Sequence, residues 1–181
     1  MKYLIIGDLH LSEPNKIPEV IINLAKKMDG IICTGDLTSK IVLEKLKKMN
    51  KTFFLRSKKM HRRMTRDLIV VKGNCDTLVS ELIDLPEYLE FEVENKKIGV
   101  IHSHQFGRGN LEKIKEFANS KKLDVIIFGH THQPLIEKRG NLFLINPGTL
   151  TGAISGKGIQ TEKTYAILEI GKDINAKINR L

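Results

Sequence analysis

The chain has 181 residues, a formal net charge of +9 and 41% hydrophobic residues. This length suits one domain with a proper core, so we expect a single domain over residues 1–181. Cys33 and Cys75 follow no zinc-ligand spacing, which disfavours a structural zinc site and a disulfide framework and favours a reducing cytoplasm. No signal-peptide core is present, and no apolar run approaches the roughly 20 residues of a membrane span. We therefore expect a cytoplasmic protein without membrane insertion.

The positive charge is concentrated in one stretch of the chain. Residues 45–66 contain ten Lys and Arg and no acid, so the rest of the chain carries about −1 (9 − 10). A strongly basic protein can attract nucleic acid, anionic lipid or acidic partners. Here any such attraction has to be a property of this stretch alone.

The first part of the chain alternates strand and helix patterns. Short β-branched and aliphatic runs predict strands, and apolar residues at helical spacing predict helices between them. The expected strands are residues 2–6, 30–34 and 67–71, and the expected helices are residues 17–28 and a segment after Ser39 that includes Val42, Leu46 and Met49. This alternation favours parallel βαβ packing.

The second part is richer in hairpin patterns. It contains one more helical segment and one more buried strand between pairs of alternating runs. We expect a hairpin over residues 89–101, a helix over 111–119, a strand over 125–128, a hairpin that turns at 139–141 and runs to 145, and a last pair of strands at 164–170 and 174–179. Mixed strands with flanking helices predict sheets covered by helices.

Five of the six histidines stand in three short patterns that each follow a predicted strand directly. Alternate residues of an extended segment point to the same side, so the two polar residues of each pattern can face one site. The patterns are Asp8-Leu9-His10, His102-Ser103-His104 and His130-Thr131-His132.

Two glycine-containing pairs, Gly35-Asp36 and Gly73-Asn74, end two further strands. Glycine allows the backbone to turn sharply there. Side chains at the carboxyl ends of several strands meet in one pocket in an open α/β sheet. Carboxylates, an amide oxygen and imidazoles form a mixed donor set that suits Mn, Fe, Co, Ni or Zn.

In this order, the five patterns resemble the motifs of the calcineurin-like metallophosphoesterase superfamily. The chain length and Asn146-Pro147-Gly148-Thr149 resemble its small single-domain branch, which comprises bacterial and archaeal phosphodiesterases related to the retromer vacuolar-sorting subunit. The resemblance extends from about residue 2 to residue 170 and implies an α/β fold, a four-layer α/β/β/α sandwich of two mixed sheets flanked by helices.

The resemblance also implies two divalent metal ions per chain. Mn or Ni is expected first, with Fe, Co, Zn and Mg as alternatives. One ion would be held by Asp8, His10, Asp36 and His132, and the other by Asp36, Asn74, His102 and His130. Asp36 would bridge the ions, and His104 would lie beside the substrate phosphate.

Two ions about 3.5–4 Å apart need an anionic bridge, and a bridging hydroxide between them is an in-line nucleophile for phosphorus. The bridge gives Asp36 a catalytic role, and His104 could neutralise the phosphoryl oxygens or protonate a leaving group. Many superfamily members have a histidine after the metal-binding Asn as general acid, but this chain has Cys75. A thiol is a poor substitute, and this absence together with the resemblance favours a phosphodiesterase over a phosphomonoesterase, with a nuclease third.

Three alternatives remain. A single histidine after a strand is usually structural, and Asp8 and Asp36 could be turn formers, although five patterns in order favour a site. The retromer relative uses this fold chiefly to bind partners, so a scaffold with a retained metal site is the rival to an enzyme. The scaffold is disfavoured because every expected ligand is present. A homodimer is also open.

The segment between Asp36 and Asn74 looks longer than in close family members, and we assign the surplus to a basic insert at residues 53–66. It is either a solvated basic loop or a flap that attracts a phosphate, nucleotide or nucleic acid. The residues expected to contact phosphate there are Arg56, Lys58, Lys59, Arg62 and Arg63.

Overall fold

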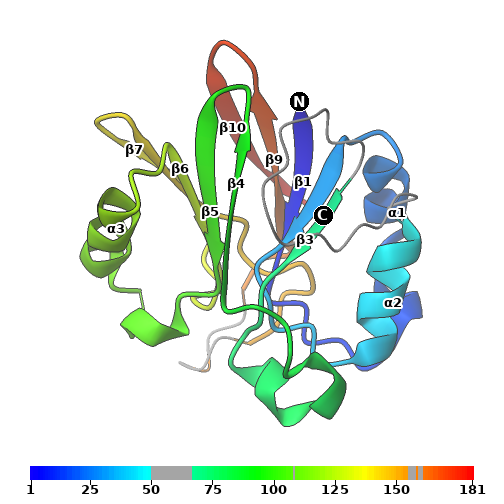
Figure 1. Ribbon diagram of the computed structural model, residues 1–181. Coiled ribbons are helices and arrows are strands. Elements are labelled where there is room, and N and C mark those ends of the chain that lie inside the picture. The colour runs from blue at the N-terminus through cyan, green and yellow to red at the C-terminus, as the bar shows by residue number, and fades with distance from the viewer. Residues whose placement is uncertain (50–66, 108, 155–157, 159–160) are drawn as a thin grey trace.

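A computed structural model describes residues 1–49, 67–107, 109–154, 158 and 161–181 (Figure 1). The basic insert at 53–66, with Arg56, Lys58, Arg62 and Arg63, lies outside these residues. Its predicted contacts with phosphate therefore stay a prediction.

The first sheet contains the βαβ units expected from the sequence. Three parallel strands, β1 (Lys2–Ile6), β2 (Gly30–Cys33) and β3 (Asp67–Val70), lie side by side in the order of the chain. The hairpin of β9 (Thr164–Ile170) and β10 (Ile174–Arg180) adds to the free side of β1 in antiparallel orientation. The order in this mixed sheet is β10-β9-β1-β2-β3.

The second sheet contains the two predicted inner hairpins and the strand between them. Its strands are β4 (Tyr88–Val93), β5 (Lys96–Ile101), β6 (Val125–Phe128), β7 (Leu135–Arg139) and β8 (Leu142–Asn146). The order is β4-β5-β6-β8-β7, with β5, β6 and β8 parallel. The carboxyl ends of β5 and β6 therefore lie at the same edge of this sheet.

Helices cover the outer faces of both sheets. Figure 1 shows α1 (Glu19–Ala25) and α2 (Lys40–Met49) beside the first sheet and α3 (Leu111–Ser120) beside the second. The predicted four-layer sandwich of two mixed sheets is confirmed. The first helix begins two residues later than predicted because Pro18 is its N-cap and disfavours helix before that point, and it ends at Ala25, three residues before the predicted end. No helix among the described residues is long and apolar enough to cross a membrane.

The described residues include four short 3-10 turns that were not predicted, because three or four residues are too few to show a helical period. They are η1 (Pro14–Lys16), η2 (Cys75–Leu78), η3 (Ser80–Leu82) and η4 (His104–Phe106). Two of them border predicted site residues, since η2 follows Asn74 directly and η4 begins at His104.

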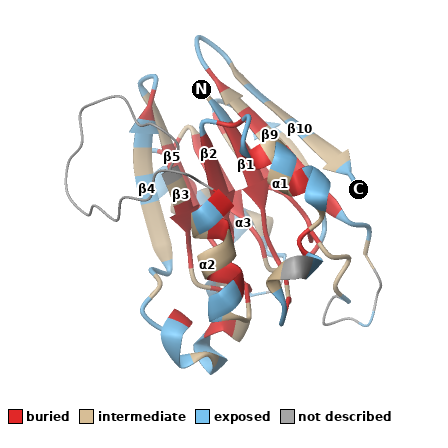
Figure 2. Ribbon diagram, turned by 90° about the vertical axis from the view of Figure 1, so that its right-hand side faces the viewer, coloured by how far each residue is buried: buried red, intermediate tan, exposed pale blue. Residues whose placement is uncertain are grey.

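Three apolar layers hold the sandwich together. Alternate residues of β1 enter different layers: Leu4 and Ile6 pack toward α1 and α2, whereas Tyr3 and Ile5 pack between the sheets. A third layer joins the second sheet to α3 through residues such as Ile114, and Figure 2 shows the buried strands at the centre of the molecule. Each fully buried aliphatic side chain contributes about 1.5–3 kcal/mol. This packing fixes the two sheets relative to each other and thereby fixes the loops that follow their strands.

Candidate metal centre

The loops after β1, β2, β3, β5 and β6 meet at one end of the two sheets. They bring the seven predicted ligands into one cluster, although these ligands are spread over more than 120 positions of the chain. The members are Asp8, His10, Asp36, Asn74, His102, His130 and His132.

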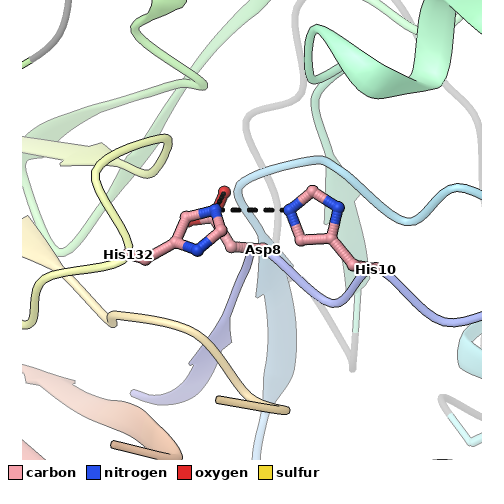
Figure 3. Close-up of side chains that lie close together, drawn as sticks. All are labelled: Asp8, His10 and His132. Carbon is pink, nitrogen blue, oxygen red and sulfur yellow. Dashed lines mark hydrogen bonds and ion pairs between the residues drawn. The ribbon is translucent and has the colours of Figure 1, made fainter. Parts of the chain in front are cut away.

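One group of donor atoms is formed by Asp8, His10 and His132, whose side chains point toward one another (Figure 3). His132 Nε2 lies 3.5 Å from Asp8 Oδ1 and 3.3 Å from His10 Nε2. One ligand atom of each residue lies within 4.8 Å of the other two. These three side chains are thus close enough to hold one cation.

A second group surrounds His102, which is fully buried. Its Nε2 lies 3.4 Å from Asp36 Oδ2 and 3.1 Å from Asn74 Oδ1. The ring of His130 packs against it, with 5.2 Å between the ring centroids. Asp36 Oδ2 is also 3.5 Å from His10 Nε2, a donor atom of the first group. A single carboxylate oxygen therefore lies between the two groups, as a bridging ligand would.

Two imidazole rings are oriented by hydrogen bonds on the side away from the cluster. His102 Nδ1 lies 2.7 Å from the carbonyl oxygen of Thr34, and His132 Nδ1 lies 2.9 Å from that of Ala153. A carbonyl only accepts, so each Nδ1 donates its N–H and the Nε2 of each ring is turned toward the cluster. Metal-binding histidines show this arrangement. The residues present therefore fit divalent cations.

The side chains converge for a different reason from the one predicted. Asp8, His10, Asp36, His130 and His132 have φ between 45° and 72°, in the left-handed region. The expectation that extended segments place alternate side chains on one side was thus wrong for these patterns, because the strands end before them. Left-handed turns aim the side chains instead, and non-glycine residues adopt them at a cost of about 1 kcal/mol or more.

The same correction applies to the pair His102 and His104. Ser103, between them, has φ 82°, and His104 is already the first residue of η4. The two rings nevertheless lie 5.5 Å apart between centroids. Both therefore border the cluster, although the backbone between them is not extended.

The two predicted turn glycines serve different purposes. Gly35 has φ 102°, which L side chains rarely adopt. Gly73 is needed for space, because a Cβ there would lie 2.0 Å from Asp36 Oδ1. The absence of a side chain at 73 allows the loop after β3 to approach the carboxylate between the two groups.

Asp76 was missed by sequence reasoning. Its carboxylate is fully buried and accepts three backbone hydrogen bonds, from Asp36 N at 2.9 Å, from Gly73 N at 2.8 Å and from Thr38 N at 2.9 Å. It therefore joins the loop after β2 to the loop after β3. The one signal in the sequence was an acid two residues after Asn74, and no general pattern distinguishes such an acid from an exposed one.

The pKa values show how charge is arranged without a metal. Burial would raise the pKa of Asp36, but the hydrogen bond and charge of His102 outweigh it and lower it to about 2. Burial would lower the pKa of His102, but Asp36 and Asp8 raise it to about 9. Burial raises the pKa of Asp8 to about 6. His102 thus carries a positive charge among the carboxylates, which is where a metal cation would take the place of its proton.

His104 borders the cluster without touching the carboxylates. Burial and then the charge of His102 lower its pKa, so the ring is neutral near pH 7. Among the described residues, its Nδ1 is a buried atom without a hydrogen-bond partner. A neutral ring can donate a hydrogen bond to a phosphoryl oxygen, but it cannot neutralise the phosphate charge.

Cys75 also lies at the cluster. Its backbone N–H donates to Asp36 Oδ1 at 2.8 Å, and Asn74 Nδ2 donates to its Sγ at 3.3 Å. Burial and then the charge of Asp36 raise the pKa of the thiol to about 11. In the absence of a metal, the thiol therefore stays protonated and is a weak acid.

Residues 1–173 match the calcineurin-like phosphoesterase superfamily domain. The chain belongs to this superfamily. It is 32% identical over 149 residues to a probable metallophosphoesterase of Methanocaldococcus jannaschii, covering 81% of this chain and 67% of that protein. The predicted family is confirmed. Its members use divalent metals and act on phosphate esters, which agrees with the donor groups described above.

Solved structures share the fold of this chain. Zinc-bound wild-type Vps29 from Entamoeba histolytica superposes with a TM-score of 0.75 at 25% identity and covers 99% of each chain. A structure described as a novel archaeal phosphodiesterase superposes with a TM-score of 0.68 at 21% identity, covering 99% of this chain and 100% of that one. The second likeness is one of fold alone.

Proposed function

We propose that this metallophosphoesterase hydrolyses phosphodiesters with two divalent ions. The observation that carries the proposal is the position of Asp36. Its Oδ2 lies 3.5 Å from His10 Nε2 and 3.4 Å from His102 Nε2, between two groups of donor atoms. A carboxylate oxygen in that position suits a pair of cations and has no comparable use around a single one.

The ligand assignment follows the two groups. A set of four side chains that includes His132 would hold one ion, and a set of four that includes His102 would hold the other, with Asp36 shared. The first set is Asp8, His10, Asp36 and His132, and the second is Asp36, Asn74, His102 and His130. Imidazole with carboxylate and amide oxygen suits Mn, Ni, Fe, Co or Zn better than Mg, which prefers oxygen alone.

When bound, two divalent ions polarise the phosphoryl group and activate a water molecule. The protein supplies the remaining parts. The hydrogen bonds of His102 Nδ1 and His132 Nδ1 keep both rings turned toward the substrate side. His104 lies 6.2 Å from His130 between ring centroids, and it donates a hydrogen bond to a phosphoryl oxygen or to the leaving group.

The preference for diesters rests on the charge of the substrate and on the resemblance to the phosphodiesterase branch. A thiol whose pKa is raised to about 11 protonates a leaving alkoxide poorly near neutral pH, which favours esters with acidic leaving groups in either class. A monoester dianion also brings more negative charge to a centre where His104 is neutral, so we expect it to react more slowly.

The test is hydrolysis of bis-p-nitrophenyl phosphate and p-nitrophenyl phosphate by metal-stripped protein, with Mn, Ni, Co, Zn or Mg added back. We expect cleavage of the diester only after metal is restored, and little cleavage of the monoester. Asp36→Ala should lower diester cleavage by about 10³-fold or more. Asp173→Ala, in the exposed turn between β9 and β10, is the matched control. If no added metal restored hydrolysis of the diester, the proposal would be refuted.

A binding scaffold is the second candidate. Leu78 in η2 and Ile154, next to the carbonyl that orients His132, are 87% and 65% exposed. Large apolar side chains exposed beside the site suit a protein partner, and the resemblance includes the retromer branch. Substituting both residues by serine would leave esterase activity unchanged and abolish any self-association seen by light scattering. Equal molar masses of the wild-type protein and the double serine variant would leave a homodimer through these side chains without support.

A further proposal is that the basic insert at 53–66 binds a nucleotide or nucleic acid. Binding of this kind weakens steeply with salt because counterions are released. Affinity for a short single-stranded oligonucleotide, measured from low to high salt, would fall steeply for the full chain. The substitutions Arg62→Ala and Arg63→Ala together would flatten that dependence.

A further inference from the structure

The thiol of Cys75 is of a kind that binds metal ions, but the proposed function assigns it no task. The superfamily pattern leads us to expect a histidine here, and the thiol is a poor replacement for it as an acid. Its position is nevertheless closely defined, because its backbone N–H donates to Asp36 Oδ1 at 2.8 Å and its Sγ accepts from Asn74 Nδ2 at 3.3 Å. The thiol is thus held between two of the assigned ligands.

The sulfur completes a third group of donor atoms. One ligand atom each of His10, Asp36 and Cys75 lies within 4.8 Å of the other two. Ligands on opposite sides of one metal are separated by at most about 4.4 Å, from bond lengths of about 2.1 Å to N or O and about 2.3 Å to S. A small rotation of the half-exposed side chain therefore suffices to bring all three atoms onto one ion.

We propose that Cys75 is a thiolate ligand of the metal ion on the His10 side and gives the centre a preference for thiophilic ions such as Zn or Co over Mn or Mg. The inference rests on the proposed metal centre. When the ion binds, the S–H bond breaks, the sulfur electron pair forms the bond to the metal, and the proton passes to solvent. No oxidation or reduction takes place.

The softness of the ligand explains the preference. Thiolate favours Zn and other thiophilic ions, whereas carboxylate and water suit Mg and Mn. The competing explanation is that Cys75 only orients Asn74 through the Nδ2 to Sγ hydrogen bond. An orienting role would change the affinity for all ions together, whereas a ligand role changes their ratio.

The test is a spectroscopic titration of metal-stripped full-length protein with Co(II). Wild-type protein should develop an intense sulfur-to-cobalt charge-transfer band in the near ultraviolet as the ion binds. Cys75→Ser should bind Co(II) without that band. Cys33→Ala is the matched control, because Cys33 is a fully buried cysteine of β2 and its substitution should leave the band unchanged.

A competition experiment gives the second readout. The ratio of Zn to Mn affinities should fall by about tenfold or more in Cys75→Ser, since a soft ligand is lost. An equal loss for both ions would show an orienting role and overturn the proposal.

The outcomes separate this inference from the proposed function. Two Co(II) ions bound per wild-type chain without a charge-transfer band would reject Cys75 as a ligand and leave the metal centre standing. A band that persists in Cys75→Ser would also reject it. Failure of the wild-type chain to bind Co(II) at all would refute both the thiolate ligand and the metal centre.

Discussion

The two ends of the sandwich use the same unusual backbone conformation for different reasons. In the turn between β4 and β5, Glu94 and Asn95 have φ of 50° and 58°, as the twist of a two-residue hairpin requires. At the other end, Asp8 and Asp36 have φ of 46° and 54° with no hairpin to require it. Hydrogen bonds between loops hold them there, such as Asp8 N to Gly35 O at 3.1 Å. Backbone strain that no hairpin requires therefore distinguishes the end of the molecule that holds the candidate metal centre.

The charges differ between the two ends in the same way. At the hairpin end, Lys96 and Asp124 are 3.8 Å apart and about one-third exposed, at 33% and 32%. At the site end, the carboxylates of Asp8, Asp36 and Asp76 are all buried. Buried carboxylates are costly unless donors or cations satisfy them. The first end can therefore tolerate changes that the second cannot.

The largest contrast is expected between two glycine substitutions. Gly73→Ala places a methyl group 2.0 Å from Asp36 Oδ1 and 2.4 Å from Asp36 N, so the two loops have to separate. We expect the free energy of unfolding to fall by about 4 kcal/mol or more, as for severe overpacking. Gly140→Ala, at φ 63° with nothing within 4 Å, should cost only about 1 kcal/mol. Urea unfolding of both variants measures the difference, and equal losses would remove this contrast between the ends.

Asp76→Asn tests the loop connection without changing side-chain volume. One of the three backbone N–H groups would then face an amide donor, so we expect a loss of about 3 kcal/mol in unfolding free energy. Binding of Mn, measured by calorimetry, should weaken as well, because a neutral amide oxygen replaces the charged acceptor that joins Asp36 N and Gly73 N. Asp173→Asn in the exposed β9–β10 turn is the control. A stable variant with unchanged Mn binding would exclude a role for Asp76 at the centre.

The stability of the metal-free protein should depend on pH because of His102. Its folded pKa of about 9 lies above its ordinary value of 6.5, so the folded state holds this proton more tightly than the unfolded state does. Its contribution is complete below pH 6.5 and is lost as pH rises toward 9. We expect a decrease on the order of 2 kcal/mol between pH 6.5 and 8.5.

Thermal unfolding of metal-stripped protein across this pH range checks the expectation. Asp36→Asn removes the carboxylate whose hydrogen bond raises the pKa of His102 and should flatten the curve. A wild-type stability that rises over the same interval would contradict the assigned ion pair.

The smallest effect is expected from Lys96→Ala at the hairpin end. The ion pair with Asp124 is partly exposed, and such pairs contribute between 0 and about 1 kcal/mol. We expect a change below about 0.5 kcal/mol in urea unfolding and no change in diester hydrolysis. A loss comparable to that of Asp76→Asn would mean that both ends are equally sensitive.

In the described part of the chain, the strands and the helices could be predicted because they depend on local periodicity. The seven clustered side chains could be proposed as ligands because they stand in short ordered motifs. The parallel order of β1, β2 and β3 followed from βαβ spacing. The left-handed turns at Asp8 and His130 could not be predicted, since contacts between loops far apart in the chain stabilise them. The same holds for Asp76, whose three partners come together only after the first sheet has formed.

The proposed ligands come from both sheets, and His10 and His132 meet across 122 positions of the chain. An unfolded chain cannot gather such distant side chains around one ion, so metal would bind only the folded protein. An ion present at 100 times its dissociation constant would then add about 2.7 kcal/mol to folding. Metal supply in the cell would therefore govern not only the turnover of substrate but also the lifetime of the protein against proteolysis.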